Sequence, residues 1–261
     1  MPMTQRGHAE TDSALAGLYD RYFAVVPANT PDLLDAAHAL RYQVYCVEHE
    51  FEDRSQQIGE RERDRDDDRA VHAVLIHKST ERVVGCVRLI LPQMNGVISS
   101  LPIRKLLDEE NRAQLDQSDP ARTAEISRYA VSKIFRRRRD EDFYADVDFA
   151  DLLGNDVRRL VPHMSLGLIR GVFGLAADEG ITTLAAAMAP ALVRLLDRFG
   201  IVFQPLGPPI DLHGLRQPCI AGCAALLAGM AARNEEYHRL ADAAYHGRNS
   251  VGGDPADLSP A

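Results

Sequence analysis

Apolar residues recur at two different spacings along this chain, and the spacing separates expected helices from expected strands. The first helix is indicated by apolar positions that step by three and four residues: Leu33, Ala37, Leu40, Val44 and Val47. Thr30-Pro31-Asp32 supplies an N-cap, a first-turn proline and an early acid, so the helix is expected from about Pro31 to Val47. Arg41 and Tyr45 would lie on or beside its buried side. The next residues, 48–69, are dense in charge and have no period, which indicates a loop.

Runs rich in β-branched residues follow this loop. Ala70–His77 and Arg82–Leu91 predict an antiparallel hairpin, and Pro92 ends its second strand. A helix is expected around residues 103–114. The apolar run from Thr123 to Val131 then has the character of a buried strand.

The second half of the chain alternates helices with strands. The expected elements are a helix at Ser165–Glu179, a strand at Ile181–Met188, a helix at Pro190–Phe199 and a strand at Ile201–Leu206. The Ala-rich run Cys219–Ala232 is too short to span a bilayer and indicates a buried or interfacial helix, within one or two helices expected from Pro218 to about Tyr245. Antiparallel strands first and crossover units later predict an α/β fold, with a mixed central sheet and helices on both faces.

A chain of 261 residues is long enough to bury a core as one large domain. We expect a polar, partly helical segment at 1–30, one domain at 31–245 and a flexible tail rich in Gly, Pro, Asp and Ser at 246–261. The formal net charge of -8 argues against a nucleic-acid partner, because neutralising phosphates requires a basic surface.

Four cysteines are scattered through a chain whose first residues, Met1 to His8, show no signal-peptide pattern. A reduced, cytoplasmic setting is therefore expected. Cys219 and Cys223 would lie one helical turn apart, and with His213 they lack a fourth ligand at a sensible spacing, so core thiols are favoured over a zinc site. We expect no metal ion and no bound cofactor.

Two charged residues, Glu125 and Arg128, interrupt the apolar strand at 123–131. Burying an ion is costly unless partners are supplied. Partners of both signs occur upstream: Asp64-x-x-Asp67, Arg88 in the hairpin and Arg41 in the first helix. If these side chains converge, they form a charge-balanced polar site of the kind that catalysis on a small charged substrate needs. The alternatives are a buried ion pair that fixes strand to helix and, for the aspartates, a solvated charge run.

The offset between Glu125 and Arg128 constrains the backbone. An offset of three residues places two side chains on opposite faces of a regular strand. A β-bulge between them would restore a common side and leave an unpaired N–H group. A shared site for these two side chains therefore requires a bulge.

The motifs of the polar site occur in a specific order, which carries more weight than any single motif. They are Arg41-x-x-x-Tyr45, Asp64-x-x-Asp67, Gly85-x-x-Arg88-Leu89 and Glu125-x-Ser127-Arg128. This order resembles the acyl-homoserine-lactone synthases, which are members of the GNAT acyltransferase superfamily. The PEP-CTERM/exosortase-associated acyltransferases and the bacterial N-acyl amino acid synthases are more similar still, through three further segments: Asp66-Asp-Asp-Arg-Ala-Val-His72, Ile126-Ser-Arg-Tyr-Ala-Val-Ser-Lys133 and Pro209-Ile-Asp-Leu-His-Gly-Leu-Arg-Gln-Pro218. The likeness covers roughly residues 33–245.

The resemblance implies a GNAT-like sheet whose bulged central strand splays from its neighbour to admit a thioester. Glu125 would be the general base, directly or through a water, and Arg128 and Arg88 would complete the catalytic set. The residues expected to hold an amino-acid-like acceptor are Arg41, Tyr45, Asp64 and Asp67. Lactone synthases carry an aromatic residue between the paired aspartates, where this chain has Arg65-Asp66, and Phe51 is the nearest upstream aromatic.

GNAT proteins place a phosphate-cradling loop after the central strand, at a helix start. The residues expected to bind the acyl donor there are Ala130, Val131, Ser132, Arg136, Arg137, Arg138 and Arg139. The arginine run has no Gly-x-Gly, so cationic side chains would replace some backbone amides and would also attract an acidic acyl carrier protein. A merely solvated loop is the alternative.

Together these features predict an N-acyltransferase that moves a fatty acyl group to the amine of an amino acid or similar small acceptor. The donor would be an acyl carrier protein or CoA thioester, and the lipid product would allow peripheral membrane contact. The alternatives are an acyl-homoserine-lactone synthase that uses S-adenosylmethionine and a non-catalytic acyl-ligand-binding protein on the same fold.

Overall fold

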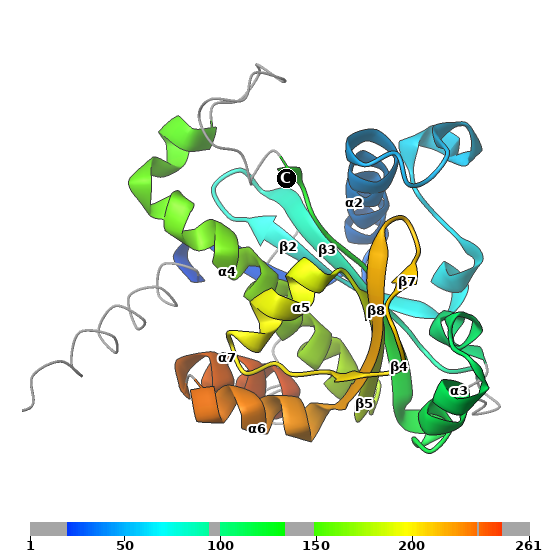
Figure 1. Ribbon diagram of the computed structural model, residues 1–261. Helices are drawn as coiled ribbons and strands as arrows, with labels where there is room; N and C mark the ends of the chain where they lie inside the picture. The colour runs from blue at the N-terminus through cyan, green and yellow to red at the C-terminus, as the bar shows by residue number, and fades with distance from the viewer. Residues whose placement is uncertain (1–19, 94–99, 134–148, 234, 247–261) are drawn as a thin grey trace, which may run out of the picture.

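A mixed β-sheet forms the centre of the protein (Figure 1). The computed structural model describes residues 20–93, 100–133, 149–233 and 235–246, with the backbone alone described over 149–163 and at 236. The strand order is β1-β2-β3-β4-β5-β8-β6, and β7 pairs with β8. The strands are β1 (Phe23–Pro27), β2 (Ala70–His77), β3 (Arg82–Ile90), β4 (Thr123–Val131), β5 (Thr183–Met188), β6 (Gln204–Pro205), β7 (Ile210–Asp211) and β8 (Leu215–Gly222).

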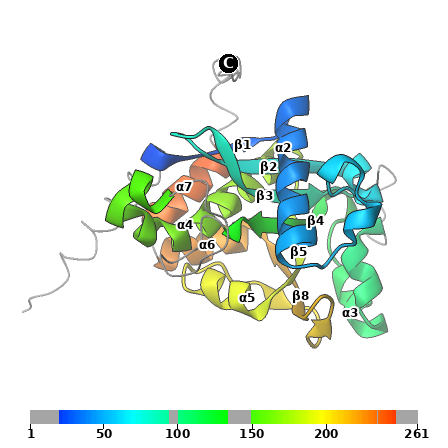
Figure 2. The same ribbon diagram turned by 90° about the horizontal axis from the view of Figure 1, so that it is seen from above.

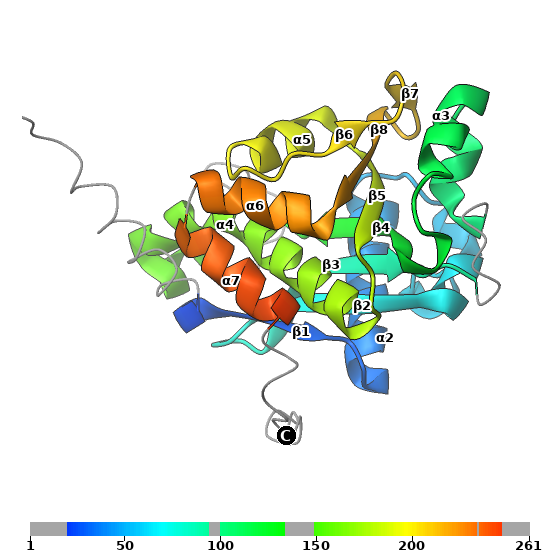
Figure 3. The same ribbon diagram turned by 90° about the horizontal axis from the view of Figure 1, so that it is seen from below.

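Helices cover both faces of the sheet, as the α/β prediction requires. They are α2 (Pro31–Arg41), α3 (Glu109–Leu115), α4 (Phe149–Asp178), α5 (Pro190–Asp197), α6 (Cys223–Arg233) and α7 (Glu235–His246). Figure 2 shows α2 crossing one face of β2, β3 and β4, and Figure 3 shows α4, α6 and α7 on the other face. The predicted fold class is confirmed.

One junction in the sheet differs from the rest. Strands β4 and β5 are parallel neighbours joined through α4, whereas the other neighbouring strands pair antiparallel. Their pairing runs from Thr123 opposite Thr183 to Ile126 opposite Ala186, and it ends there although both strands continue. The sheet therefore opens between the second half of β4 and the end of β5.

The core packs on both faces of the sheet. The larger cluster holds apolar residues of α4, α6 and α7 against the strands, and a smaller one holds α2 against β2, β3 and β4. Gly171 allows α4 to lie close to the sheet, because a Cβ at this position would come within 2.9 Å of side-chain carbons of Ala73 and Val25. This packing fixes the strands on either side of the opening.

Several expectations from the sequence are confirmed at the N-terminal end of the domain. The hairpin of β2 and β3 has the predicted strands, and Thr30 caps α2 through its hydroxyl, which accepts a hydrogen bond from Leu33 N. The α-helix ends at Arg41, however, and the chain continues as a π-helix over Tyr42–Glu48. The expected loop at 48–69 contains three short 3-10 helices.

Other expectations are corrected. The residues from Leu215 to Gly222 form strand β8, so Cys219 lies in a strand and the predicted helix begins only at Cys223. Pairing with β5 from Gln217 to Gly222 outweighs the Ala-rich composition of the run that begins at Cys219, which favours a helix locally. The expected strand at 201–206 is limited to the two residues of β6. This strand pairs with β8 and not with β5.

Two further helix boundaries differ from the sequence pattern. The helix expected around 103–114 is a 3-10 helix at Pro102–Leu106 followed by α3, which Asp108 caps. Helix α4 ends near the predicted position but begins at Phe149, well before Ser165. Strand β1 was not predicted and lies within the N-terminal segment that was expected to be polar and partly helical. The predicted tail at 247–261 and residues 1–19 lie outside the described residues.

None of the helices in the described part of the chain combines the length and the apolar character needed to span a bilayer.

Candidate active site

A β-bulge lies at the opening of the sheet, in the central strand β4. Cys86 pairs with Ala130 and Arg88 pairs with Ser127, so Val87 alone lies opposite both Arg128 and Tyr129. Arg128 has a φ of 48°, in the left-handed region that non-glycine residues seldom adopt. The bulge turns the Arg128 side chain to the α2 face, where Arg88 Nε donates a hydrogen bond of 2.9 Å to Ser127 Oγ. The bulge that the sequence parity requires is therefore present.

Arg128 meets a group of carboxylates on this face. Its guanidinium contacts Glu62 at 2.8 Å, Glu52 at 3.0 Å and Asp64 at 3.1 Å. Its Cζ also lies 5.2 Å from the centre of the Tyr45 ring, a cation–π distance. Asp64 and Tyr45 are among the site residues predicted from the sequence, whereas Glu62 and Glu52 are not.

Arg88 and Arg41 extend the same network beneath the surface. Arg88 holds Asp64 in a two-point contact of 2.7 and 3.0 Å and reaches Asp67 at 2.8 Å. Arg41 is fully buried, with Nε 2.5 Å from Glu62 and a fork of 2.6 and 3.0 Å on Asp67. The sheet thus brings together all three predicted arginines and both predicted aspartates.

The network shifts the protonation of its carboxyl groups. Burial alone would raise the pKa of Asp67, but the Arg41 and Arg88 guanidiniums hold it well below its ordinary value. The pKa of Glu62 is lowered in the same way, because the hydrogen bonds of Arg128 and Arg41 outweigh its burial. These carboxylates stay ionised at neutral pH, as a structural ion network requires.

A cleft of about 700 Å³ opens beside this network, where β4 and β5 separate. Its charged end is formed by Glu52, Asp64, Arg88, Glu125 and Arg128. Its apolar end is formed by Ile126, Ile169, Met188, Leu192, Leu196 and Phe203. Arg41 and Asp67 do not line this cleft; they lie behind its charged wall. Among the predicted acceptor residues, Tyr45 and Asp64 reach the cleft surface.

Glu125 is chemically distinct from the other acids of the cleft. Its side chain lines the cleft and the residue is only 6% exposed. Burial raises its pKa from 4.5 to about 7, although the Ile103 N–H, which donates a 2.7 Å hydrogen bond, and the charge of Arg88 act in the opposite direction. A carboxyl with this pKa exchanges a proton readily near neutral pH, which suits a general base.

The predicted donor-binding residues lie at the end of β4. Ala130 lines the cleft, and Val131 is buried. Ser132 Oγ donates a hydrogen bond of 3.2 Å to Glu48, whose carboxylate also accepts from Lys133 N. The run from Arg136 to Arg139 lies outside the described residues. The predicted core thiols are buried free cysteines, and Cys219 Sγ contacts the Ala186 carbonyl oxygen at 3.2 Å.

Comparison with known proteins bears on the class of enzyme. Residues 40–145, from the end of α2 past β4, match the acetyltransferase (GNAT) domain family. This segment of the chain is similar to a GNAT acetyltransferase domain. The predicted enzyme class, an acyltransferase, is therefore confirmed. Among curated protein sequences, none matches the chain.

Solved structures show the same fold. The acyl-homoserine-lactone synthase LasI aligns with a TM-score of 0.54 and 18% identity, over 80% of this chain and 96% of its own. The CoA-dependent acyl-homoserine-lactone synthase BjaI, solved with SAM and isopentyl-CoA, aligns with a TM-score of 0.55 and 20% identity, over 83% of this chain and 89% of its own. FeeM, an N-acyl amino acid synthase from uncultured soil microbes, aligns more weakly, with a TM-score of 0.48 and 13% identity over 81% and 96% of the two chains. At these identities the likeness to LasI and BjaI shows a shared fold and no more.

Proposed function

We propose that this GNAT acyltransferase moves a fatty acyl group from an acyl carrier protein or CoA thioester to the amine of an amino acid or similar small acceptor. The observation that carries the proposal is the position of Glu125. This buried carboxyl, with a pKa near 7, lines a cleft that is charged at one end and apolar at the other. The association with PEP-CTERM/exosortase systems and the cytoplasmic location stay predictions from the sequence.

The chemistry assigned to Glu125 is proton removal. An amino group enters the cleft as an ammonium ion and must lose a proton before it attacks. The Glu125 carboxylate accepts that proton, directly or through a water, and the nitrogen lone pair then attacks the thioester carbonyl carbon. As the tetrahedral intermediate collapses, the new C–N bond remains, the C–S bond breaks and the second amine proton leaves with the thiolate. The products are an amide and a free thiol.

The charges of the cleft suit an acceptor with an ammonium group. Asp64 and Glu52 are 29% and 31% exposed at their side chains, whereas Arg88 and Arg41 are buried beneath them. The accessible part of the network is therefore mainly acidic and attracts a cation. Arg128 is partly exposed, so its guanidinium would contact a carboxylate on the same acceptor.

The apolar end of the cleft suits a fatty acyl chain. Met188, Leu192 and Phe203 extend the opening away from the charged network, so a chain would lie beside β5 while its carbonyl faces Glu125. Arg65, Lys105 and Arg216 add cationic side chains to the cleft lining. Their charge favours an anionic donor, whether a carrier protein or CoA.

Acyl-homoserine-lactone synthesis from S-adenosylmethionine is the second candidate, and the fold shared with LasI and BjaI favours it. An adenosine group is usually held by stacking on an aromatic ring. Phe51, the aromatic residue of the cleft nearest in sequence to the aspartates, is already stacked against His49 at 5.0 Å and His213 at 5.3 Å between ring centres. This occupied ring favours the smaller amino-acid acceptor.

Mass spectrometry of lipid extracts from cells that express the protein tests the proposal. We expect an N-acyl amino acid that is absent from cells expressing Glu125→Gln. A homoserine lactone, with release of methylthioadenosine by the purified protein, would establish the second candidate instead. The matched control is Asp116→Asn, which removes a surface ion pair with Arg104 and should leave the product unchanged. The absence of any new acylated product from the wild type would contradict acyl transfer.

A further inference from the structure

A second cavity lies on the other side of Asp67 from the acyltransferase cleft. Its volume is about 320 Å³, and it is bounded by α2, β2 and the end of α4. Its polar lining comes mainly from two histidines and three acids: His38, His72, Asp67, Asp178 and Glu179. Among the described residues, none that lines this cavity is a lysine or an arginine. Such a lining attracts a cation.

The two histidines have nitrogen atoms that the fold leaves unpaired. His38 and His72 are only 2% and 4% exposed. Within the described part of the chain, both ring nitrogens of His38 and Nδ1 of His72 have no hydrogen-bond partner. Buried polar atoms without partners are rare because each one costs desolvation free energy. The two rings therefore indicate a ligand that the fold is arranged to receive.

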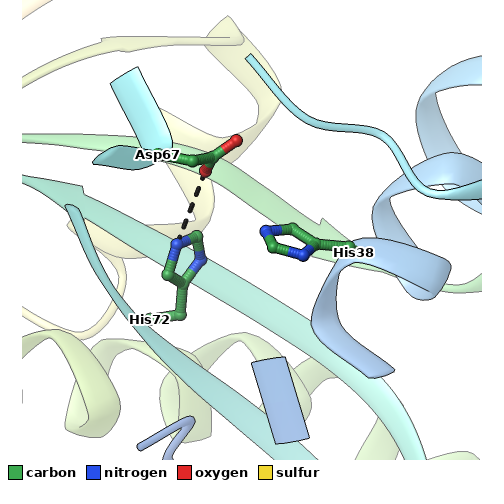
Figure 4. A group of neighbouring side chains, drawn as sticks. All are labelled: His38, Asp67 and His72. Carbon is green, nitrogen blue, oxygen red and sulfur yellow. Dashed lines mark ion pairs between the residues drawn. The ribbon is translucent and has the colours of Figure 1, made fainter. Parts of the chain in front are cut away.

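The geometry of the group identifies that ligand. Figure 4 shows His38 from α2 and His72 from β2 beside each other, with the Asp67 carboxylate next to His72. One nitrogen of each ring and one carboxylate oxygen all lie within 4.8 Å of one another. His72 Nε2 and Asp67 Oδ1 are 3.5 Å apart, close to the edge of about 3.4 Å that a tetrahedral site with bonds of about 2.1 Å requires.

We propose that His38, Asp67 and His72 bind one divalent transition-metal ion of the zinc type. Two imidazoles and one carboxylate are a common zinc ligand set, and the fourth position would face the cavity, which is large enough for water. The argument for this metal site does not rest on the proposed acyl-transfer reaction. It also departs from the sequence expectation of no metal, because these residues form no motif along the chain.

The protonation state of the histidines suits the metal. Burial lowers the pKa of His38 to about 4 and that of His72 to about 3, with the nearby Arg41 charge adding to both effects. Both rings are therefore neutral at pH 7 and present lone pairs without first losing a proton. This neutrality would persist across the pH range in which most proteins are assayed.

Asp67 couples the metal site to the acyltransferase cleft. Its carboxylate already accepts four hydrogen bonds, two from Arg41, one from Arg88 and one from Asp64 N. A metal ion must replace one of them. The Arg88 contact is the one most readily given up, because Arg88 keeps its two-point contact with Asp64. We therefore expect moderate affinity rather than the tight binding of a dedicated zinc cage.

The experiment uses the full chain, dialysed against a chelator and titrated with zinc chloride in a calorimeter. We expect one ion per chain, bound with moderate affinity, an increase in melting temperature with zinc, and visible absorption bands of tetrahedral cobalt when Co²⁺ replaces zinc. His38→Leu and His72→Leu, which keep a buried apolar volume, should each weaken binding at least about 10-fold. Circular dichroism establishes that these variants fold, and His38→Gln serves if His38→Leu does not.

The matched control is His246→Ala. His246 and His238 flank Asp242 on the surface of α7 and form a competing exposed group. Wild-type affinity in this control supports the buried site. Zinc binding that disappears in His246→Ala but persists in folded His38→Leu would overturn the proposal, as would the absence of stoichiometric binding to the wild-type chain.

Discussion

Replacing Glu125 by Gln should change the way in which stability depends on pH. Glutamine keeps the size of the side chain and an oxygen that accepts the Ile103 N–H, but it cannot ionise. In the wild type, burial raises the pKa of Glu125 from 4.5 to about 7, so the folded state holds a proton that the unfolded state releases. The variant has no such difference between its two states.

The sign follows from proton linkage. Below pH 4.5 the carboxyl is protonated in both states, and its contribution to stability is fully present. Between pH 4.5 and about 7 only the unfolded state ionises, so the wild type loses stability as the pH rises. At 1.36 kcal/mol for each pH unit, the loss is about 3 kcal/mol, and it is complete slightly above pH 7. Asp67 and Glu62 have lowered pKa values, so their contribution to stability is lost in the opposite direction, as the pH falls below 3.8 for Asp67 and below 4.5 for Glu62.

Urea unfolding of both proteins at pH 5 and pH 8 measures the effect. The free energy of unfolding of Glu125→Gln, relative to that of the wild type, should increase by about 2.5 kcal/mol from pH 5 to pH 8, because only the wild type loses stability over this range. Because the other carboxyl groups are common to both proteins, their contributions cancel in this difference. Glu110→Gln, at an exposed position on α3, should show no comparable change. A difference that is the same at both pH values would show that Glu125 is ionised in the folded protein, and the proposed base would lose its physical basis.

Three other substitutions test separate parts of the site. Glu62→Gln removes the buried countercharge of Arg41 and Arg128 and should cost about 3–5 kcal/mol of unfolding free energy in urea; a loss below about 1 kcal/mol would contradict the role of Glu62 in the network. Arg128→Lys keeps the charge but loses the guanidinium fork, so steady-state kinetics should show the KM for the amine acceptor rising about 10-fold or more while that for the acyl donor changes little; equal changes in both would count against acceptor binding. Met188→Trp narrows the apolar end of the cleft and should shift the product towards shorter acyl chains by mass spectrometry, whereas an unchanged chain-length profile would place the acyl group elsewhere.

The sequence contains the local features that build the opening in the sheet. Thr30 and Pro31 begin α2, the hairpin follows from two β-branched runs, and both are decided by residues close together along the chain. The bulge can also be predicted from the sequence. Glu125 and Arg128 are offset by an odd number of residues, whereas a shared site requires both side chains on one face of the strand. These features depend on the residue spacing of a strand or a helix, and that spacing can be measured along the sequence.

The ion-pair partners that depend on tertiary packing could not be predicted from the sequence. They include the residues that decide the electrostatics of the site. Glu62 is no different in sequence from the exposed acids around it, and only the path of the 3-10 turns places it between Arg41 and Arg128. The end of strand β8 could not be predicted locally, because Cys219–Gly222 precede the Ala-rich residues of α6 and are held extended by pairing with β5. His38 faces His72 only because α2 crosses β2 at that point. The acids and histidines of these charged groups can therefore be identified only when the register and crossing of distant elements are known. Glu125, the proposed general base, is different, because a carboxyl within an apolar strand is unusual in the sequence itself.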